Sequence, residues 1–165
     1  MTEELVFLPL GGTGEIGMNL NLYAYGDAWI MADLGISFAD PYLPGVDVIM
    51  PEPQFIVERR DKLLALFVTH AHEDHAGAVA HLWPRLLCPV YATPFTAAIL
   101  RGKLAEAGLI HEVPLHEVPL GARVDAGPFR VDYVSLTHSI PEPNALLIET
   151  PAGRVFHTGD WKLDP

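Results

Sequence analysis

The fold of this chain is decided by residues 63–75, which read Leu63-Leu64-Ala65-Leu66-Phe67-Val68-Thr69-His70-Ala71-His72-Glu73-Asp74-His75. An apolar run of strand length is followed there by three histidines and an aspartate within six positions. Because polar residues end the run at once, it predicts an interior β-strand whose carboxyl end opens into a loop. Ligands of open α/β sheets gather at the carboxyl ends of strands, so this loop is the first candidate for a functional site.

The polar half of this stretch has the composition of a metal site. In an extended segment His70 and His72 point the same way, because side chains alternate with a period of two. The turn that follows can bring Asp74 and His75 to a neighbouring point, and four ligands this close suit two metal ions better than one. Imidazole and carboxylate together favour zinc, with manganese as the second choice where oxygen ligands dominate. The alternative is a set of surface histidines beside a helix at 76–83, with Asp74 as its N-cap.

The composition predicts one packed domain in a reducing compartment. The chain has 165 residues, 50% of them hydrophobic, and a mean hydropathy of +0.23, which suits one core better than two. Its single cysteine, Cys88, excludes an internal disulfide framework and is expected to be a buried structural thiol. Glu3 and Glu4 stand where a signal peptide would carry lysine or arginine, and no apolar run approaches membrane-spanning length. We therefore expect a cytoplasmic protein with no membrane partner.

The charge of the chain is strongly acidic. There are 10 lysines and arginines against 21 aspartates and glutamates, a formal net charge of −11. This balance argues against nonspecific nucleic-acid binding by this piece alone. If the substrate is RNA, most of the phosphate-binding charge must lie on other surfaces or be concentrated in the cleft.

A glycine-rich motif near the N-terminus first suggests a different function. Gly12-Thr13-Gly14-Glu15-Ile16-Gly17 matches the G-x-G-x-x-G pattern of dinucleotide sites, and Asp33 lies roughly where a ribose-binding acid would. Such a site needs a helix next, but residues 19–25 alternate like a strand. We therefore expect a tight loop that borders the cleft. It follows a first strand at 5–10, in which Pro9 indicates an edge position or a strand end.

The segments that follow are expected to frame the site. A turn at 26–27 and a returning strand at 28–33 place Asp33 at the end of that strand. Residues 34–53 hold four prolines and two glycines, which predict a long irregular loop at the substrate rim. A short helix is expected at 54–61.

Two further helices are expected after the histidine motif. The first covers 76–83 and is stopped by Pro84, and its His81 is expected to pack or to lie on the surface rather than bind metal. The second begins after Thr93 as N-cap, and Gly108 lies past its end. Its expected apolar positions are Phe95, Ala98, Ile99 and Leu104.

Two later strands also deliver polar residues at their ends. Residues 129–136 alternate as a half-buried strand and end just before His138. A strand at 144–150 and a turn follow, and a strand at 155–160 ends on a carboxylate. His157 is expected to be a side-chain neighbour of the site and not a ligand.

Four motifs therefore occur together in this chain, and they are Gly11-Gly12-Thr13-Gly14-Glu15-Ile16-Gly17, Thr69-His70-Ala71-His72-Glu73-Asp74-His75, His138-Ser139-Ile140-Pro141 and Thr158-Gly159-Asp160-Trp161-Lys162. The histidine motif alone resembles the metallo-β-lactamase superfamily. With the glycine loop and the two later motifs, the chain resembles ribonuclease J, in the β-CASP branch of that superfamily. The resemblance spans essentially all 165 residues.

This resemblance implies an α/β fold, the metallo-β-lactamase αββα sandwich, of which only the N-terminal half is expected here. Residues 1–165 would be the N-terminal part of the lactamase domain, without the β-CASP and C-terminal domains. One further histidine ligand of the family is expected outside this chain. The chain alone is therefore expected to be inactive.

The resemblance also implies two divalent metal ions, zinc by preference and manganese as the alternative. His70, His72 and His138 would hold one of them. Asp160 would bridge the two ions.

Asp74 and His75 would help to hold the second ion. Asp74 is in addition the candidate catalytic residue, which would orient the nucleophile and accept its proton. Asp33 resembles the family aspartate that braces the histidine loop without binding metal, with a simple strand-end turn residue as the alternative.

The implied activity is hydrolysis of RNA phosphodiesters by a hydroxide shared between the two metals, both endonucleolytic and 5′-to-3′ exonucleolytic, in RNA processing and decay. Single-stranded RNA with a 5′-monophosphate is the implied preferred substrate, and the full-length protein is expected to be a homo-oligomer. Two alternatives stay open. One is another hydrolase on this scaffold, acting on esters, thioesters or DNA, and the other is an inactive truncated metal-binding fragment.

Overall fold

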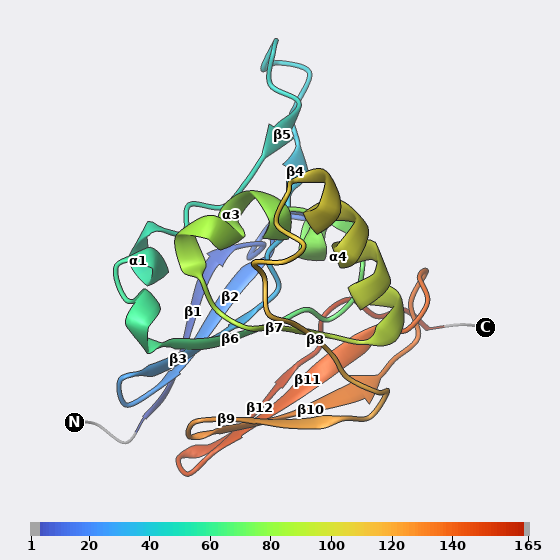
Figure 1. The fold of residues 1–165 in the computed structure, drawn as a ribbon. Helices are drawn as coiled ribbons and strands as arrows, with labels where there is room; N and C mark the ends of the chain where they lie inside the picture. The colour runs from blue at the N-terminus through green and yellow to red at the C-terminus, as the bar shows by residue number, and fades with distance from the viewer. Residues whose placement is uncertain (1–3, 164–165) are drawn as a thin grey trace.

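Two β-sheets face each other in this chain, and helices cover the outer side of the larger one. The computed structural model describes residues 4–163, and Figure 1 shows the helices, the first sheet and the second sheet as three successive layers. One core cluster lies between the helices and the first sheet, and a second cluster lies between the two sheets. The α/β sandwich expected from the sequence is therefore confirmed, with three of the four αββα layers formed by the described residues.

The first sheet has six strands in the order β1-β2-β3-β6-β7-β8. They are β1 (Leu5–Gly11), β2 (Leu20–Tyr25), β3 (Ala28–Ala32), β6 (Leu63–Phe67), β7 (Val90–Ala92) and β8 (Leu115–Glu117). The first three are antiparallel, whereas β3, β6, β7 and β8 run parallel. β1 forms one edge of the sheet, as Pro9 indicated. Because Ala32 pairs with Phe67, the residues that follow β3 and β6 leave the sheet side by side.

The second sheet is antiparallel, in the order β12-β11-β10-β9. Its strands are β9 (Arg123–Ala126), β10 (Phe129–Ser135), β11 (Asn144–Thr150) and β12 (Gly153–His157). The predicted alternation in β10 is confirmed, since Phe129, Val131 and Tyr133 are buried against the first sheet while Arg130 is exposed. The predicted strand at 155–160 ends earlier, at His157, so Asp160 lies on the loop beyond it.

The helices differ from the prediction in two places. They are α1 (Gln54–Val57), the 3₁₀ turn η1 (Arg60–Lys62), α2 (Glu73–Ala76), α3 (Val79–Leu86) and α4 (Pro94–Glu106). The single helix expected at 76–83 is in fact split, and α3 continues past Pro84. Pro84 lies in the last turn of α3, so the hydrogen bond that its missing N–H cannot make is lost near the helix end, and the left-handed Leu87 ends α3 instead. Among residues 4–163, no helix combines the length and apolar character needed to cross a membrane.

Helix α4 is not capped by the residue expected from the sequence. Thr93 occupies the N-cap position, but its hydroxyl is buried without a hydrogen-bond partner. The backbone N–H of Phe95 donates instead to the Glu142 carboxylate at 2.8 Å. The buried face of α4 also differs from the prediction, because Ala98 and Ile99 are exposed. The residues of α4 that pack inward are Thr96, Ala97, Leu100 and Leu104.

The long segment at 34–53 is not wholly irregular. Two short strands, β4 (Ser37–Phe38) and β5 (Val48–Ile49), pair antiparallel within it. We call residues 37–49 the arm, and Figure 1 shows it projecting from the body of the molecule. Strands of two residues have no periodicity to detect in the sequence, which is why the prediction missed them.

The single cysteine is enclosed in the core beneath α3. Cys88 is 1% exposed, and its carbonyl oxygen accepts a hydrogen bond from the Trp83 indole N–H at 2.7 Å. Burial raises the pKa of the Cys88 thiol to about 12. We expect this thiol to stay unreactive toward a thiol-specific reagent at pH 8 in the folded chain and to react completely in denaturant. Fast labelling of the folded chain would contradict this packing.

Candidate metal centre

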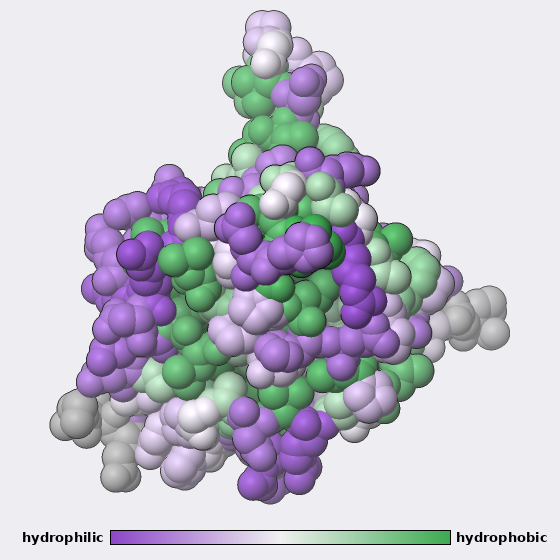
Figure 2. Space-filling model, in the orientation of Figure 1, coloured by the Kyte–Doolittle hydropathy of each residue, from purple (hydrophilic) through white to green (hydrophobic). Residues whose placement is uncertain are grey.

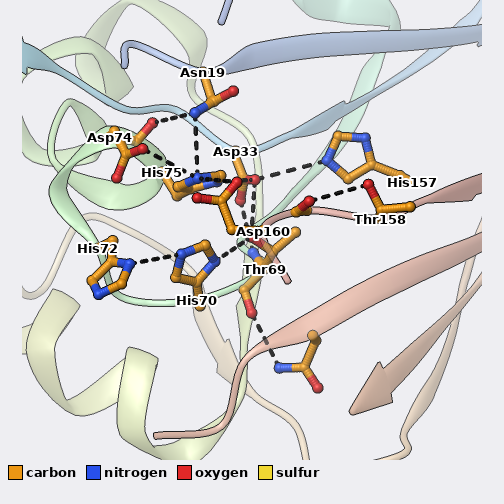
Figure 3. A network of polar contacts seen from close by, with 12 residues as sticks. Asn19, Asp33, Thr69, His70, His72, Asp74, His75, His157, Thr158 and Asp160 are labelled. Atoms are coloured by element: carbon orange, nitrogen blue, oxygen red, sulfur yellow. Dashed lines mark hydrogen bonds and ion pairs between the residues drawn. The ribbon is translucent and has the colours of Figure 1, made fainter. Parts of the chain in front are cut away.

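All the ligand candidates meet at the carboxyl ends of strands from both sheets. The histidine loop follows β6, His138 follows β10 and Asp160 follows β12, so three separated segments converge on one point. Figure 3 shows Asp160 beside the residues of the histidine loop. Two groups of donor atoms result, with all atoms of a group within 4.8 Å of one another. The first group is His70, His72 and His138, and the second is His70, His75 and Asp160.

The first group has the spacing of metal ligands. His70 Nε2 lies 3.1 Å from His72 Nδ1, and His138 Nε2 lies 3.1 Å from the same His72 atom. Tetrahedral zinc with bonds of 2.0–2.1 Å would place neighbouring nitrogens roughly 3.3–3.4 Å apart. Three imidazoles at this spacing suit a single ion, so the residues present fit the metal that the sequence predicted.

Hydrogen bonds set the tautomer of His70. The Thr69 hydroxyl donates to Asp33 Oδ2 at 2.9 Å, so the His70 Nδ1–H must donate to Thr69 Oγ1, also at 2.9 Å. The lone pair of His70 Nε2 therefore points into the first group, as in metal-binding histidines generally. Burial, with a smaller effect from His75, lowers the pKa of His70 to about 4, so the ring is neutral at pH 7.

The second group combines two histidines with the carboxylate of Asp160, and Asp74 lies beside it. His75 Nε2 lies 3.3 Å from Asp160 Oδ1 and 3.4 Å from Asp74 Oδ2. Asp160 also faces the first group, with its Oδ2 3.8 Å from His138 Nε2. Because His70 has only Nε2 available, it serves one ion, and the second position rests on His75, Asp74 and Asp160.

Asp33 is the anchor of the histidine loop. It is fully buried at the end of β3, and its Oδ2 lies 2.7 Å from His75 Nδ1. Its Oδ1 accepts the backbone N–H of Thr69, also at 2.7 Å. A carboxylate only accepts, so His75 must donate from Nδ1, which leaves Nε2 as the ring nitrogen that faces the second group. Asp33 thus contacts the histidine loop but belongs to neither group of donor atoms.

The charges around His75 favour a cation beside it. Burial alone would lower the pKa of His75, but the carboxylates of Asp33, Asp160 and Asp74 outweigh it and raise the pKa to about 12. Burial would raise the pKa of Asp33, yet His75 and His157 hold it well below the usual range. The same environment that favours a proton on His75 Nε2 favours a divalent ion in its place.

The backbone of the second group is held by close packing against the segment after β3. The Leu34 N–H donates to the His75 carbonyl oxygen at 2.8 Å. A side chain at Gly35 would collide with the carbonyl oxygen of Asp74, so only glycine allows this approach. The loop is therefore positioned by main-chain contacts as well as by its anchor.

Several residues around the centre were not singled out by the sequence. The Asn19 amide donates to the Asp74 carbonyl oxygen at 3.1 Å and contacts His75 Nε2 at 3.3 Å. On the other side, the Asn144 amide donates to the carbonyl oxygen of Thr69 at 3.1 Å. Both asparagines stand at a strand end, which is the one sequence signal they carry.

A second line of support reaches Asp33 from the core between the sheets. The Tyr23 hydroxyl lies 3.0 Å from His157 Nδ1. His157 Nε2 lies 3.8 Å from Asp33 Oδ2 (Figure 3). The structure places His157 beside the anchor and outside both groups of donor atoms, in the position of a neighbour.

Comparison with known proteins defines the class to which this fold and centre belong. Residues 29–165 match the family described as beta-lactamase superfamily domain. The chain belongs to the beta-lactamase superfamily.

Within that class, the relatives are ribonuclease J proteins, as the sequence motifs indicated. Ribonuclease J of Sinorhizobium meliloti is 55% identical over 166 residues, covering 98% of this chain and 29% of that protein. Ribonuclease J of Thermus thermophilus is 38% identical, covering 99% of this chain and 30% of the relative. Ribonuclease J2 of Bacillus subtilis is 33% identical, with coverages of 99% and 29%. The chain thus spans less than a third of the length of these relatives.

A solved structure supports the fold independently. A protein of unknown function from Enterococcus faecalis V583 superposes with a TM-score of 0.70 and covers 97% of this chain and 44% of its own. At 20% sequence identity, this likeness bears on the fold alone.

Proposed function

We propose that this chain is part of a metal-dependent ribonuclease that hydrolyses RNA phosphodiesters. The observation that carries the proposal is the pair of donor groups at the meeting point of the two sheets. One has three imidazoles, the other has two imidazoles and a carboxylate, and they share His70. The ribonuclease J relatives support RNA as the substrate. We further propose endonucleolytic and 5′-to-3′ exonucleolytic cleavage of single-stranded RNA, with a 5′-monophosphate preferred.

The residues of the centre would hold two divalent ions. His70, His72 and His138 would hold one of them. His75 would bind the second ion through Nε2. Zinc is the proposed metal because nitrogen ligands dominate the first group, and manganese is the alternative.

Asp74 is the proposed catalytic residue. Bound divalent ions would lower the pKa of water to roughly 7 and offset the charge of the phosphodiester. The Asp74 carboxylate is half-buried, and the neighbouring His75 holds its pKa below the usual value, so it is ionised at neutral pH. It is therefore able to accept a hydrogen bond from an attacking water and then to take its proton.

The chain would act within a longer protein. We propose that residues 1–165 form the N-terminal part of a lactamase domain, because the ribonuclease J relatives extend well beyond the matched region. A cytoplasmic location and a homo-oligomeric full-length protein belong to the same proposal. The chain alone would then be a metal-binding fragment without activity, and esters, thioesters or DNA are the alternative substrates of the intact enzyme.

The test uses the full-length protein on single-stranded RNA carrying either a 5′-monophosphate or a 5′-triphosphate, with zinc or manganese supplied. We expect faster loss of the monophosphate RNA, ending in mononucleotides. Removal of metal with a chelator should stop cleavage, and addition of the ion should restore it. Absence of RNA cleavage with either metal would contradict the ribonuclease proposal and favour the other substrates.

A further inference from the structure

An apolar cavity adjoins the candidate metal centre on the side of the arm. Its volume is about 330 Å³, at the lower end of small-molecule sites, which span roughly 300–1,000 Å³. One wall belongs to the metal centre and the other to the glycine loop and the arm. The lining residues are Ile16, Gly17, Ile36, Ser37, Phe38, His72, Glu73 and Asp74.

The outer wall of this cavity holds two hydrophobic side chains that folding leaves in water. Phe38 is 71% exposed and Ile16 is 93% exposed. Figure 2 shows the arm standing out from the body with hydrophobic surface along it. Exposed apolar groups gathered beside a polar site indicate a surface that binds a ligand or another molecule.

The backbone segments that carry Ile16 and Phe38 are held together by close contacts. The Met18 N–H donates to the Ile36 carbonyl oxygen at 2.8 Å, which ties the glycine loop to the base of the arm. Gly17 has a φ of +125°, and a side chain there would collide with Ser37 Oγ. The glycine motif therefore sets the position of Ile16, which lines the same cavity as Phe38. This accounts for a motif that the metal centre does not use.

The chemistry of the cavity favours a flat apolar group over a phosphate. The carboxylates of Glu73 and Asp74 lie in its wall, so an anion would be repelled there. The nearby Lys103 ammonium is paired with Glu73 at 2.6 Å. A nucleobase has an uncharged face that stacks on an aromatic ring, and such stacking is tolerant of sequence.

We propose that this cavity is a nucleobase subsite, in which the base of a nucleotide flanking the scissile phosphate stacks on Phe38 against Ile16. The inference rests on the proposed ribonuclease function, because the metal centre must hold the adjoining phosphate. It also explains how an acidic chain contacts RNA, since base stacking needs no positive charge.

The test compares Phe38→Ala with Tyr42→Ala in the full-length, metal-loaded protein. Tyr42 is 89% exposed on the same arm but does not line the cavity, so it is a matched control. We expect Phe38→Ala to raise KM for single-stranded RNA roughly 5- to 150-fold, from the usual strength of base stacking, with little change in kcat. Phe38→Trp should keep KM close to that of the unmodified protein, and Tyr42→Ala should leave it unchanged.

A series of RNAs with one abasic nucleotide moved along the strand locates the base. At one position next to the cleavage site, loss of the base should raise KM for the unmodified protein and have no further effect in Phe38→Ala. Two results would overturn the subsite alone. One is that Phe38→Ala cleaves RNA with the same KM as the unmodified protein. The other is that Phe38→Ala changes the oligomeric state, measured by light scattering, while no abasic RNA raises KM for the unmodified protein. No cleavage of RNA by the unmodified protein would overturn the proposed function, and the subsite with it.

Discussion

Replacing Asp74 with alanine in the full-length protein should nearly abolish RNA cleavage while RNA binding survives. Proton transfer by a positioned side chain contributes about 10²- to 10⁴-fold to a rate, and Asp74 would in addition help to hold the second ion. Its carboxylate lies 3.4 Å from His75 Nε2, and Asp74 lines the cavity between the metal centre and the arm. A negative charge does not attract phosphates, so its loss should not weaken RNA binding. The measurements are kcat on 5′-monophosphate RNA and a dissociation constant for the same RNA.

The matched control for this variant is Asp61→Ala. Asp61 is exposed, belongs to neither donor group and does not line the cavity beside the metal centre. We expect this variant to keep most of the activity. Metal content should be measured for Asp74→Ala and for Asp74→Asn, because the amide keeps an oxygen ligand but is not a base. Full turnover by Asp74→Ala would contradict the role assigned to this residue.

The histidine motif shows how much of such a site is predictable from local spacing. His70 and His72 lie beyond the end of β6, and their spacing of two residues in an extended segment predicted a shared direction. Their ring nitrogens do lie 3.1 Å apart. His138 and Asp160 lie far from them in the sequence, and only the rule that strand ends gather ligands, together with the family resemblance, placed them at the same point. The structure brings all four together.

The features that the sequence missed depend on contacts between distant segments. The Glu142 cap of α4 comes from 47 residues away, and no local pattern encodes such a pairing. The Asn19 and Asn144 amides act on main-chain carbonyls of the histidine loop, so their role appears only when the strands are assembled. Conversely, Thr93 is the residue type expected at an N-cap, but its hydroxyl makes no capping hydrogen bond, because Glu142 accepts the helix N–H instead.

The second large effect is expected on stability, from replacing Asp33, the anchor of the histidine loop. Replacing Asp33 with alanine should destabilise the chain by about 3–5 kcal/mol, because it leaves the buried His75 without its carboxylate. Asp33 has a φ of +63°, in the left-handed region, where alanine is strained. Urea unfolding in the presence of a chelator measures this change. Asp27→Ala, at an exposed site in the turn before β3, is the matched control and should have little effect.

The pH dependence of the anchor follows from the directions of its pKa values. The pKa of Asp33 is lowered in the folded chain, so its stabilisation is present above the ordinary value of 3.8 and is lost as the pH falls. The pKa of His75 is raised from 6.5 to about 12, so its stabilisation is full below 6.5 and is lost as the pH rises toward 12. With metal chelated, we expect the pair to stabilise the fold most between pH 3.8 and pH 6.5. Asp33→Ala should remove that maximum.

Asp33→Asn separates the positioning role of this residue from the simple loss of a side chain. Asparagine tolerates the left-handed backbone, so the fold should survive better than with alanine. If the amide nitrogen takes the place of Oδ2, it donates to His75 Nδ1 and forces the ring proton onto Nε2, where the second ion would bind. We expect metal affinity to fall by roughly 10- to 100-fold, measured by competition with a chelator. An asparagine variant that is folded and binds both ions as tightly as the unmodified protein would show that the carboxylate does not set the tautomer of His75.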